Sequence, residues 1–159
     1  MNIAVYPGTF DPITKGHLDI LDRAANIFDK VFIAVAQDTQ KDTLFTVPER
    51  LEMIKGCTDN FDNIAIDDFS GLVVNYAQNV DASVIIRGLR QVSDFEYEFQ
   101  MALMNRHLNR DIDTIFLMPD EKYSYLSSSI VREITKFEGD ITRFVPKNVY
   151  KTLKNKLEE

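Results

Sequence analysis

The chain has 159 residues, of which 45% are hydrophobic and 27% charged, and its formal net charge is −7. These values are ordinary for a soluble globular protein, and we expect one domain that spans residues 1–159. The negative charge argues against nucleic acid as a partner. No apolar run approaches the roughly 20 residues of a membrane span, so we expect no membrane partner either.

The first apolar run, residues 2–6, predicts a strand, and a sharply broken loop that ends in TKGH follows it. In this loop Gly8 permits close approach of a ligand, and Thr9 adds a hydroxyl group. Thr14 is a suitable N-cap, which places His17 in the opening turn of the next helix, where anions are favoured. There His17 can donate hydrogen bonds to a phosphate. The composition of the loop equally allows a plain turn with a solvated histidine.

The next two predicted strands, residues 31–36 and 64–67, are followed by loops with weaker signals. After the first of them, Lys41 is the lone cation and could neutralise a phosphate as a point charge. Taken by itself, Lys41 is better explained as an ordinary exposed lysine. The second loop, residues 67–74, is apolar and contains glycine, so it could line a pocket or simply pack in the core.

The fourth predicted strand, residues 83–87, ends at Arg87, and a Gly-Leu turn separates this arginine from Arg90. Guanidinium groups match phosphate oxygens in a bidentate way, so this turn predicts an anion site. The alternative is a pair of surface arginines that balance the acidic residues at 94, 96 and 98.

The fifth predicted strand, residues 114–119, leads into a loop that ends in three serines, Ser127 to Ser129. At a helix start, these serines offer hydroxyl and amide donors to an anion. Simple helix capping would need only one of them. The helix that follows is expected to end near Gly139, a plausible residue for the left-handed position after a helix.

Strands and helices alternate along the whole chain, which predicts right-handed crossovers. The fold class we expect is therefore α/β, a single doubly wound, Rossmann-like domain with a five-stranded parallel sheet buried on both faces and helices on both faces. The predicted helices are marked by Leu18–Phe28, Thr46–Glu49, Leu72–Val80, Ser93–Leu108, Ser127–Gly139 and the residues after Pro146. In such sheets ligands bind beyond the carboxyl ends of the strands, where all five loops meet.

Several short motifs resemble those of known enzymes. TKGH at 14–17 and LSSSIVR at 126–132 resemble the two signatures of the nucleotidylyltransferase superfamily, with Leu126 where isoleucine is usual. Within it, the ordered set resembles the bacterial phosphopantetheine adenylyltransferase family: YPGTFDP at 6–12, FTVPER at 45–50, IIRGLR at 85–90, DFEYE at 94–98 and MNRHL at 104–108. The likeness runs nearly from end to end.

The resemblance implies transfer of AMP from ATP to 4′-phosphopantetheine in coenzyme A biosynthesis, by a magnesium-dependent, cytoplasmic homohexamer. It implies catalysis by His17 and Lys41. The implied ATP site comprises Thr9, Phe10, His17, Gly88, Leu89, Arg90, Glu98, Tyr123, Ser124, Tyr125, Leu126, Ser127, Ser128 and Ser129, and the implied pantetheine site comprises Thr9, Lys41, Val73 and Arg87. It assigns no residue as a metal ligand, since the ligands of Mg²⁺ could be mostly substrate oxygens and water.

Two rival functions stay open at this level. The same chemistry could serve another acceptor, such as nicotinamide mononucleotide or the substrate of a cytidylyl transfer. Alternatively, the domain could be a non-catalytic adenine-nucleotide sensor, which would keep the glycine loop and the arginines but would not require His17. The single cysteine, Cys57, cannot form an internal disulfide, which fits a reducing cytoplasm.

Overall fold

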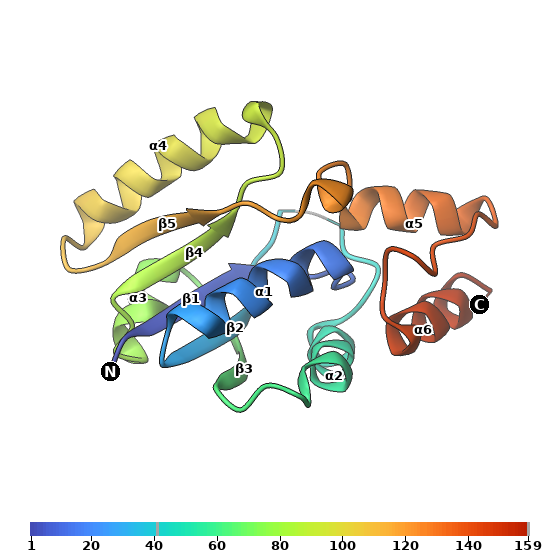
Figure 1. Ribbon diagram of the computed structural model, residues 1–159, viewed down its shortest axis with the longest axis horizontal. Coiled ribbons are helices and arrows are strands. Elements are labelled where there is room, and N and C mark those ends of the chain that lie inside the picture. Colours follow the sequence, from blue (N-terminus) through green and yellow to red (C-terminus); the bar gives the residue numbers. More distant parts are fainter. Residues whose placement is uncertain (41, 159) are drawn as a thin grey trace.

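Five parallel strands form one twisted sheet in the order β3-β2-β1-β4-β5 (Figure 1). The computed structural model describes residues 1–40 and 42–158. The strands are β1 Ile3–Gly8, β2 Lys30–Ala36, β3 Ile64–Phe69, β4 Val84–Gly88 and β5 Asp113–Leu117. The chain order runs outward from β1 to β3 and then returns to β4, so the direction of winding reverses between β1 and β4. In open α/β sheets this reversal creates a crevice at the carboxyl ends of the strands.

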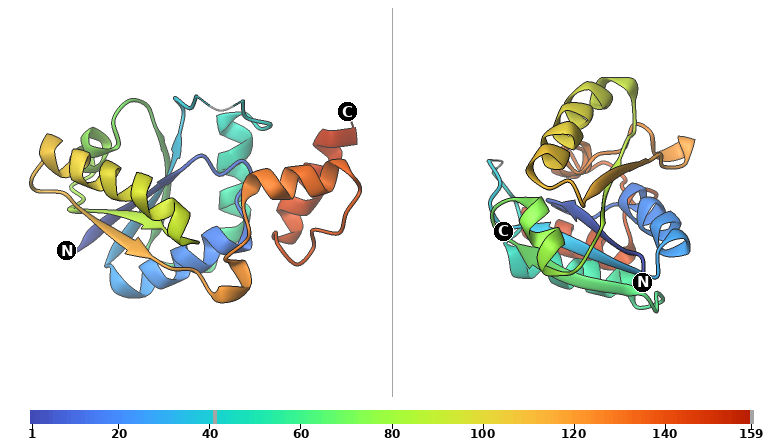
Figure 2. Two further views of the ribbon diagram at one scale, coloured as in Figure 1. Left: turned by 90° about the horizontal axis from the view of Figure 1, so that it is seen from above. Right: turned by 90° about the vertical axis from the view of Figure 1, so that its left-hand side faces the viewer.

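Helices cover both faces of the sheet, as two views at right angles show (Figure 2). Their bounds are α1 Lys15–Ile27, α2 Val47–Thr58, α3 Val73–Asn79, α4 Val92–Leu108, α5 Ser128–Lys136 and α6 Lys147–Glu158, with a short 3₁₀ helix at Glu121–Tyr123. Side chains of α1 and α2 share one hydrophobic core with the sheet, and side chains of α3 belong to a second core on the other face. Of the helices described in the two ranges above, none has the length and apolar character to cross a membrane.

The predicted α/β fold is confirmed, with each expected strand and helix in its place. Local sequence signals decide where the helices start. Thr14 and Thr46 each cap a helix. In both cases the side chain of the third helical residue, His17 or Glu49, accepts a hydrogen bond from the backbone N–H of the capping threonine.

Two expectations about local structure are wrong. We expected strands buried on both faces, but no residue of β3 or β5 is fully buried, because these two strands form the edges of the sheet. We also expected Gly139 to take the left-handed position after α5. That position belongs to Glu138, with φ of 59°. Gly139 comes next, and there a Cβ would lie 2.4 Å from the Ile134 side chain, so this glycine is required for space.

Candidate active site

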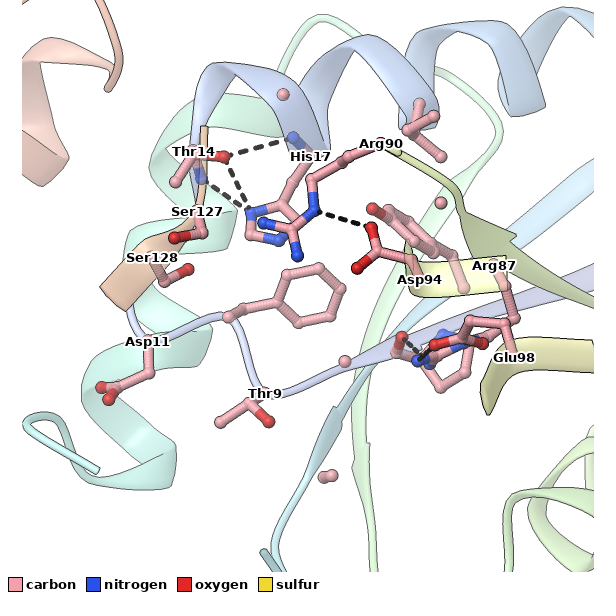
Figure 3. A pocket seen from close by; sticks show the side chains of 18 of the residues that line it. Thr9, Asp11, Thr14, His17, Arg87, Arg90, Asp94, Glu98, Ser127 and Ser128 are labelled. Carbon is pink, nitrogen blue, oxygen red and sulfur yellow. Dashed lines mark hydrogen bonds and ion pairs between the residues drawn. The ribbon is translucent and has the colours of Figure 1, made fainter. Parts of the chain in front are cut away.

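A cavity of about 520 Å³ opens at the carboxyl ends of the strands, above the point where the strand order reverses (Figure 3). Its walls come from the β1–α1 loop, the first turn of α1, the β4–α4 turn, α4, and the segment that begins α5. The N-termini of two helices, α1 and α5, therefore meet the arginine-bearing turn at one space. Helix N-termini and guanidinium groups both favour bound anions, so the cavity suits a ligand rich in phosphate.

Asp11 anchors the β1–α1 loop from behind. Its buried carboxylate accepts hydrogen bonds from the backbone N–H groups of Leu44 and Phe45, each at 2.9 Å. Arg132 of α5 lies 3.3 Å from the same carboxylate and also donates to the Asp11 carbonyl. The bonds join three segments that are distant in sequence, so the loop is held in position by the fold.

Arg50 holds the same loop from the side of α2. Its guanidinium group, only 2% exposed, donates to the carbonyl oxygen of Thr9 at 2.7 Å and to that of Ala36 at 3.2 Å. A buried guanidinium with fixed acceptors ties the end of β2 to the loop after β1. Arg50 therefore positions Thr9 at the cavity without facing the cavity itself.

The His17 ring is oriented by the start of its own helix. The backbone N–H of Thr14 donates to Nδ1 at 3.0 Å, and the Thr14 hydroxyl lies 3.1 Å from the same atom. Since Nδ1 accepts a hydrogen bond from the Thr14 N–H, the neutral ring carries its own hydrogen on Nε2. Burial, aided by the charge of Arg90, lowers the pKa of His17 to about 4. The ring is thus a neutral hydrogen-bond donor at physiological pH.

Phe10 lines the cavity together with Tyr6 and His17 and contacts the rings of both. Its backbone takes the left-handed conformation, with φ of 48°, and its ring meets the rings of Tyr6 and His17 edge-on at 5.4 and 5.1 Å. The ring packs directly over Gly8, where a Cβ would come within 2.8 Å of it. The glycine of this loop is therefore needed to seat the ring, which in turn supports the histidine.

Acidic partners on α4 hold Arg87, which lies at the end of β4, and Arg90, which lies in the turn that follows. Arg87 forms a two-pronged pair with Glu98, with both N–O distances 2.8 Å, and donates to the Pro7 carbonyl at 3.3 Å. Arg90 donates to the Leu126 carbonyl at 3.0 Å and lies 3.5 Å from Asp94. Within the described part of the chain, three of the five N–H donors of Arg87 are thus engaged, and the other two can bind a ligand.

The three consecutive serines behave differently from one another. Ser127 caps α5 by accepting from the N–H of Ile130, and Ser128 donates to the Pro12 carbonyl at 2.7 Å. Ser129 is exposed at the cavity, and within residues 1–40 and 42–158 its hydroxyl has no hydrogen-bond partner. One serine thus caps the helix, one ties the loop, and one faces the cavity.

Most of the residues singled out from the sequence meet at this cavity. Those that line it are Thr9, Phe10, His17, Val73, Arg87, Gly88, Arg90, Glu98, Tyr123, Leu126, Ser127, Ser128 and Ser129. Leu89, Ser124 and Tyr125 do not line it, and Tyr125 instead packs edge-on against Phe144. Lys41 lies outside the described residues.

Sequence reasoning missed the residues that support the site from behind. Asp11 and Arg50 stood inside motifs that we quoted, but their partners lie 34 and 41 positions away. Asp94 looked like a surface charge, whereas it lines the cavity beside Arg90. The available signal was chemical, since a charged residue within an apolar segment is buried only where it has partners.

The described residues contain no group of three or more His, Cys, Asp or Glu side chains that could hold a metal ion. Three of the carboxylates at the cavity, Asp11, Asp94 and Glu98, are already paired with arginines. This part of the chain therefore offers no protein cage for a cation.

Comparison with known proteins agrees with this geometry. A family model described as cytidylyltransferase-like matches residues 5–134. The phosphopantetheine adenylyltransferase of Caldanaerobacter subterraneus subsp. tengcongensis is 52% identical over 159 residues, which cover 100% of this chain and 99% of the relative. The chain belongs to the phosphopantetheine adenylyltransferase family. It is accordingly an enzyme of the nucleotidyltransferase class, and the family membership expected from the motifs is confirmed.

A second relative in this family and two solved structures extend the comparison. The phosphopantetheine adenylyltransferase of Alkaliphilus metalliredigens is 51% identical over 156 residues, covering 98% of this chain and 99% of the relative. A putative nicotinate-nucleotide adenylyltransferase from Vibrio parahaemolyticus has a TM-score of 0.76 at 15% identity, covering 100% of this chain and 98% of that one. The nicotinic acid mononucleotide adenylyltransferase of Plasmodium falciparum, complexed with NaAD, has a TM-score of 0.68 at 16% identity, covering 99% and 94%. At these identities the structures show a shared fold.

Proposed function

We propose that this enzyme transfers the adenylyl group of ATP to 4′-phosphopantetheine and so acts in coenzyme A biosynthesis. A phosphate oxygen of phosphopantetheine attacks the α-phosphorus of ATP in line with the departing group. The new bond joins that oxygen to the α-phosphorus, and the bond from the α-phosphorus to the bridging oxygen breaks. The products are dephospho-coenzyme A and pyrophosphate. The nucleophile belongs to the substrate, so the protein needs no nucleophilic side chain of its own.

The orientation of His17 is the observation that carries this proposal. With Nδ1 occupied by the Thr14 N–H, Nε2–H is the donor available to a ligand in the cavity that Arg87 and Arg90 also line. A fixed neutral donor at the α-phosphate would stabilise the charge that builds up there during transfer. A ring that does not change protonation near pH 7 supplies this donor without acting as a base.

The other proposed roles follow the two sides of the cavity. Arg90, Gly88, Ser129 and the amides at the start of α5 would hold the triphosphate, whose β- and γ-phosphates leave as pyrophosphate. Thr9, Arg87 and Val73 would hold phosphopantetheine, with Lys41 as the proposed second cation for its phosphate. Catalysis then rests on aligning two anionic groups that otherwise repel each other.

We propose Mg²⁺ as the metal that accompanies ATP. Because the described residues offer no three-carboxylate or histidine cluster, the ion would bind mainly to triphosphate oxygens and water, which is its usual mode in nucleotide sites. When bound, it neutralises phosphate charge.

The exposed side of α4 supports the proposal of a homohexamer. Phe95, Phe99, Leu103 and Met104 are 46–55% exposed there, and Figures 1 and 2 show α4 at the outer edge of the molecule. Contiguous apolar surface of this kind usually marks a protein interface. Light scattering should give a mass six times the 18.3 kDa of one chain, and Leu103→Glu should shift the population to smaller species. If the unsubstituted chain is a monomer by light scattering, the proposal of a homohexamer is refuted.

A cytoplasmic location is consistent with the one cysteine. Burial raises the pKa of Cys57 to about 11, and its thiol donates to the Met53 carbonyl at 2.8 Å. The group is therefore a protonated thiol at neutral pH, and thiols of this kind persist in a reducing compartment.

The reaction itself is tested by incubating the protein with ATP, Mg²⁺ and one acceptor while pyrophosphate is followed. We expect release with 4′-phosphopantetheine and none with nicotinamide mononucleotide. Release only with another acceptor would reassign the substrate. Tight ATP binding without release under any condition would favour the nucleotide sensor and refute the proposal.

A further inference from the structure

Tyr6 presents a hydroxyl group to the cavity that the roles above do not use. The residue belongs to β1 and is 4% exposed, yet it lines the cavity wall. Throughout residues 1–40 and 42–158, no side chain or backbone group forms a hydrogen bond with this hydroxyl. The fully buried side-chain atoms without a partner in the described residues do not include this hydroxyl, so the oxygen is open to the cavity, where a bound ligand can accept its hydrogen.

The surroundings of the hydroxyl place it at the crevice between β1 and β4. A Cβ built on Gly88 would lie 3.9 Å from the Tyr6 oxygen and 3.5 Å from the side chain of Ile20. The positive charges of Arg87 and Arg90 are near enough to act on the phenol, although burial dominates and raises its pKa. The group therefore stays a neutral O–H donor beside two cations, where an acceptor oxygen with negative charge is favoured.

Strand alternation assigns the hydroxyl to one half of the cavity. Tyr6 and Ile86 face the core shared with α1, whereas Ile85 faces the opposite core. Successive residues of a strand point to opposite faces, so Gly88 shares the α1 side with Tyr6, and Arg87 points to the other side. The α1 side is also that of His17, one turn before Ile20.

We propose that Tyr6 is a further binding residue, whose hydroxyl donates a hydrogen bond to an oxygen of the ribose–α-phosphate part of the nucleotide. The inference rests on the proposed function, since it takes the α1 half of the cavity as the nucleotide half. The edge-on contact between the rings of Tyr6 and Phe10, at 5.4 Å, does not involve the hydroxyl. A phenylalanine at position 6 could make the same contact. The oxygen atom is therefore unexplained by packing.

The test compares Tyr6→Phe with the unsubstituted protein by calorimetry, using ATP, AMP and 4′-phosphopantetheine as separate probes. AMP carries the ribose and the α-phosphate but lacks the pyrophosphate. We expect ATP and AMP each to bind about tenfold more weakly, the scale of one hydrogen bond to a charged group, and phosphopantetheine to bind unchanged. The melting temperature should stay the same, because no protein hydrogen bond is lost.

Tyr76→Phe is the matched control. That hydroxyl donates to Asp67 at 2.8 Å and does not line the cavity, so its loss should lower stability and leave ATP affinity unchanged. Unchanged ATP and AMP binding in Tyr6→Phe, or weakening confined to ATP or to phosphopantetheine, overturns the inference. Failure of the proposed function would appear separately, as absence of phosphopantetheine-dependent pyrophosphate release from the unsubstituted protein.

Discussion

The two walls of the cavity are built in different ways. The α1 wall is fixed by the fold, since Asp11 and Arg50 bond its loop to segments distant in the sequence, and Thr14 fixes the His17 ring within the wall. The α4 wall carries Arg87 and Arg90 paired with carboxylates of its own helix, and of the α4 residues only Asn105 is buried. One wall is preorganised, and the other is charged, open and poorly covered.

The difference indicates that the two walls have different roles in the reaction. Stabilising charge at a reacting phosphorus needs groups that do not move, which suits the α1 wall. Gathering anionic substrates needs cations whose partners can be exchanged, which suits the α4 wall. Substitution of His17 should therefore affect turnover, substitution of the groups that hold its loop should affect stability, and substitution of the arginines on the second wall should affect substrate affinity.

Replacing His17 by alanine should produce the largest effect. We expect kcat to fall by about 10²- to 10³-fold, the scale for loss of one donor to developing charge, while KM changes little. Steady-state kinetics checks this, and ATP binding by calorimetry controls for a misfolded site. An unchanged kcat would remove His17 from the mechanism and the α1 wall from its assigned role.

Arg50→Ala should come next, through stability. It leaves the carbonyl oxygens of Thr9 and Ala36 without donors in a buried position, which we expect to cost about 3 kcal/mol in the free energy of unfolding. Urea unfolding measures this. The control is Arg23→Ala, since within residues 1–40 and 42–158 the one ion pair of that arginine is the exposed one with Asp19, and its loss should change stability by less than about 1 kcal/mol. Equal losses of stability in the two variants would show that the bonds from Arg50 do not hold the β1–α1 loop in place.

The pH dependence of stability gives a third, smaller effect. The pKa of His17 is about 4 in the folded chain and about 6.5 when unfolded, so between these values the unfolded state binds more protons. Stability therefore falls as the pH drops through this window, and this ring should account for about 2 kcal/mol between pH 7 and pH 5. Urea unfolding at both pH values, repeated with His17→Gln, isolates the contribution. If the free energy of unfolding of His17→Gln falls as much between pH 7 and pH 5 as that of the unsubstituted protein, groups other than His17 cause the pH dependence.

Arg87→Ala sharpens the comparison from the α4 wall. We expect affinity for 4′-phosphopantetheine to fall about tenfold, with ATP affinity and stability largely kept, because the arginine is partly exposed. Calorimetry with each substrate measures this. Arg106→Ala is the control, because this arginine of α4 does not line the cavity and pairs with exposed Asp113 of β5. A loss confined to ATP would assign Arg87 to the nucleotide instead.

The fold could be predicted because its signals are local. Capping residues such as Thr14 lie within one turn of what they cap, and a buried strand shows itself as a short apolar run. Edge strands broke that rule, since β3 and β5 have a neighbour on one side only. Local pattern cannot say which strands are outermost.

The candidate site was predictable only in part. The loops after the strands could be located because parallel strands end at one edge, and this brought His17 and both arginines of the β4–α4 turn to one cavity. The bonds that position those groups join residues up to 121 positions apart, as between Arg132 and Asp11, and no sequence period records them. Nor does the sequence indicate that the Tyr6 hydroxyl faces the cavity, because at the level of sequence Tyr6 is an ordinary aromatic residue of a strand.

Position 8 shows how tightly the α1 wall limits change. The methyl group of an alanine there would press on the Phe10 ring, and that ring stands between Tyr6 and His17. In a saturation library screened for growth, glycine should thus be the sole survivor at this position, even though its backbone angles are open to any amino acid. The barrier is the volume of one carbon atom.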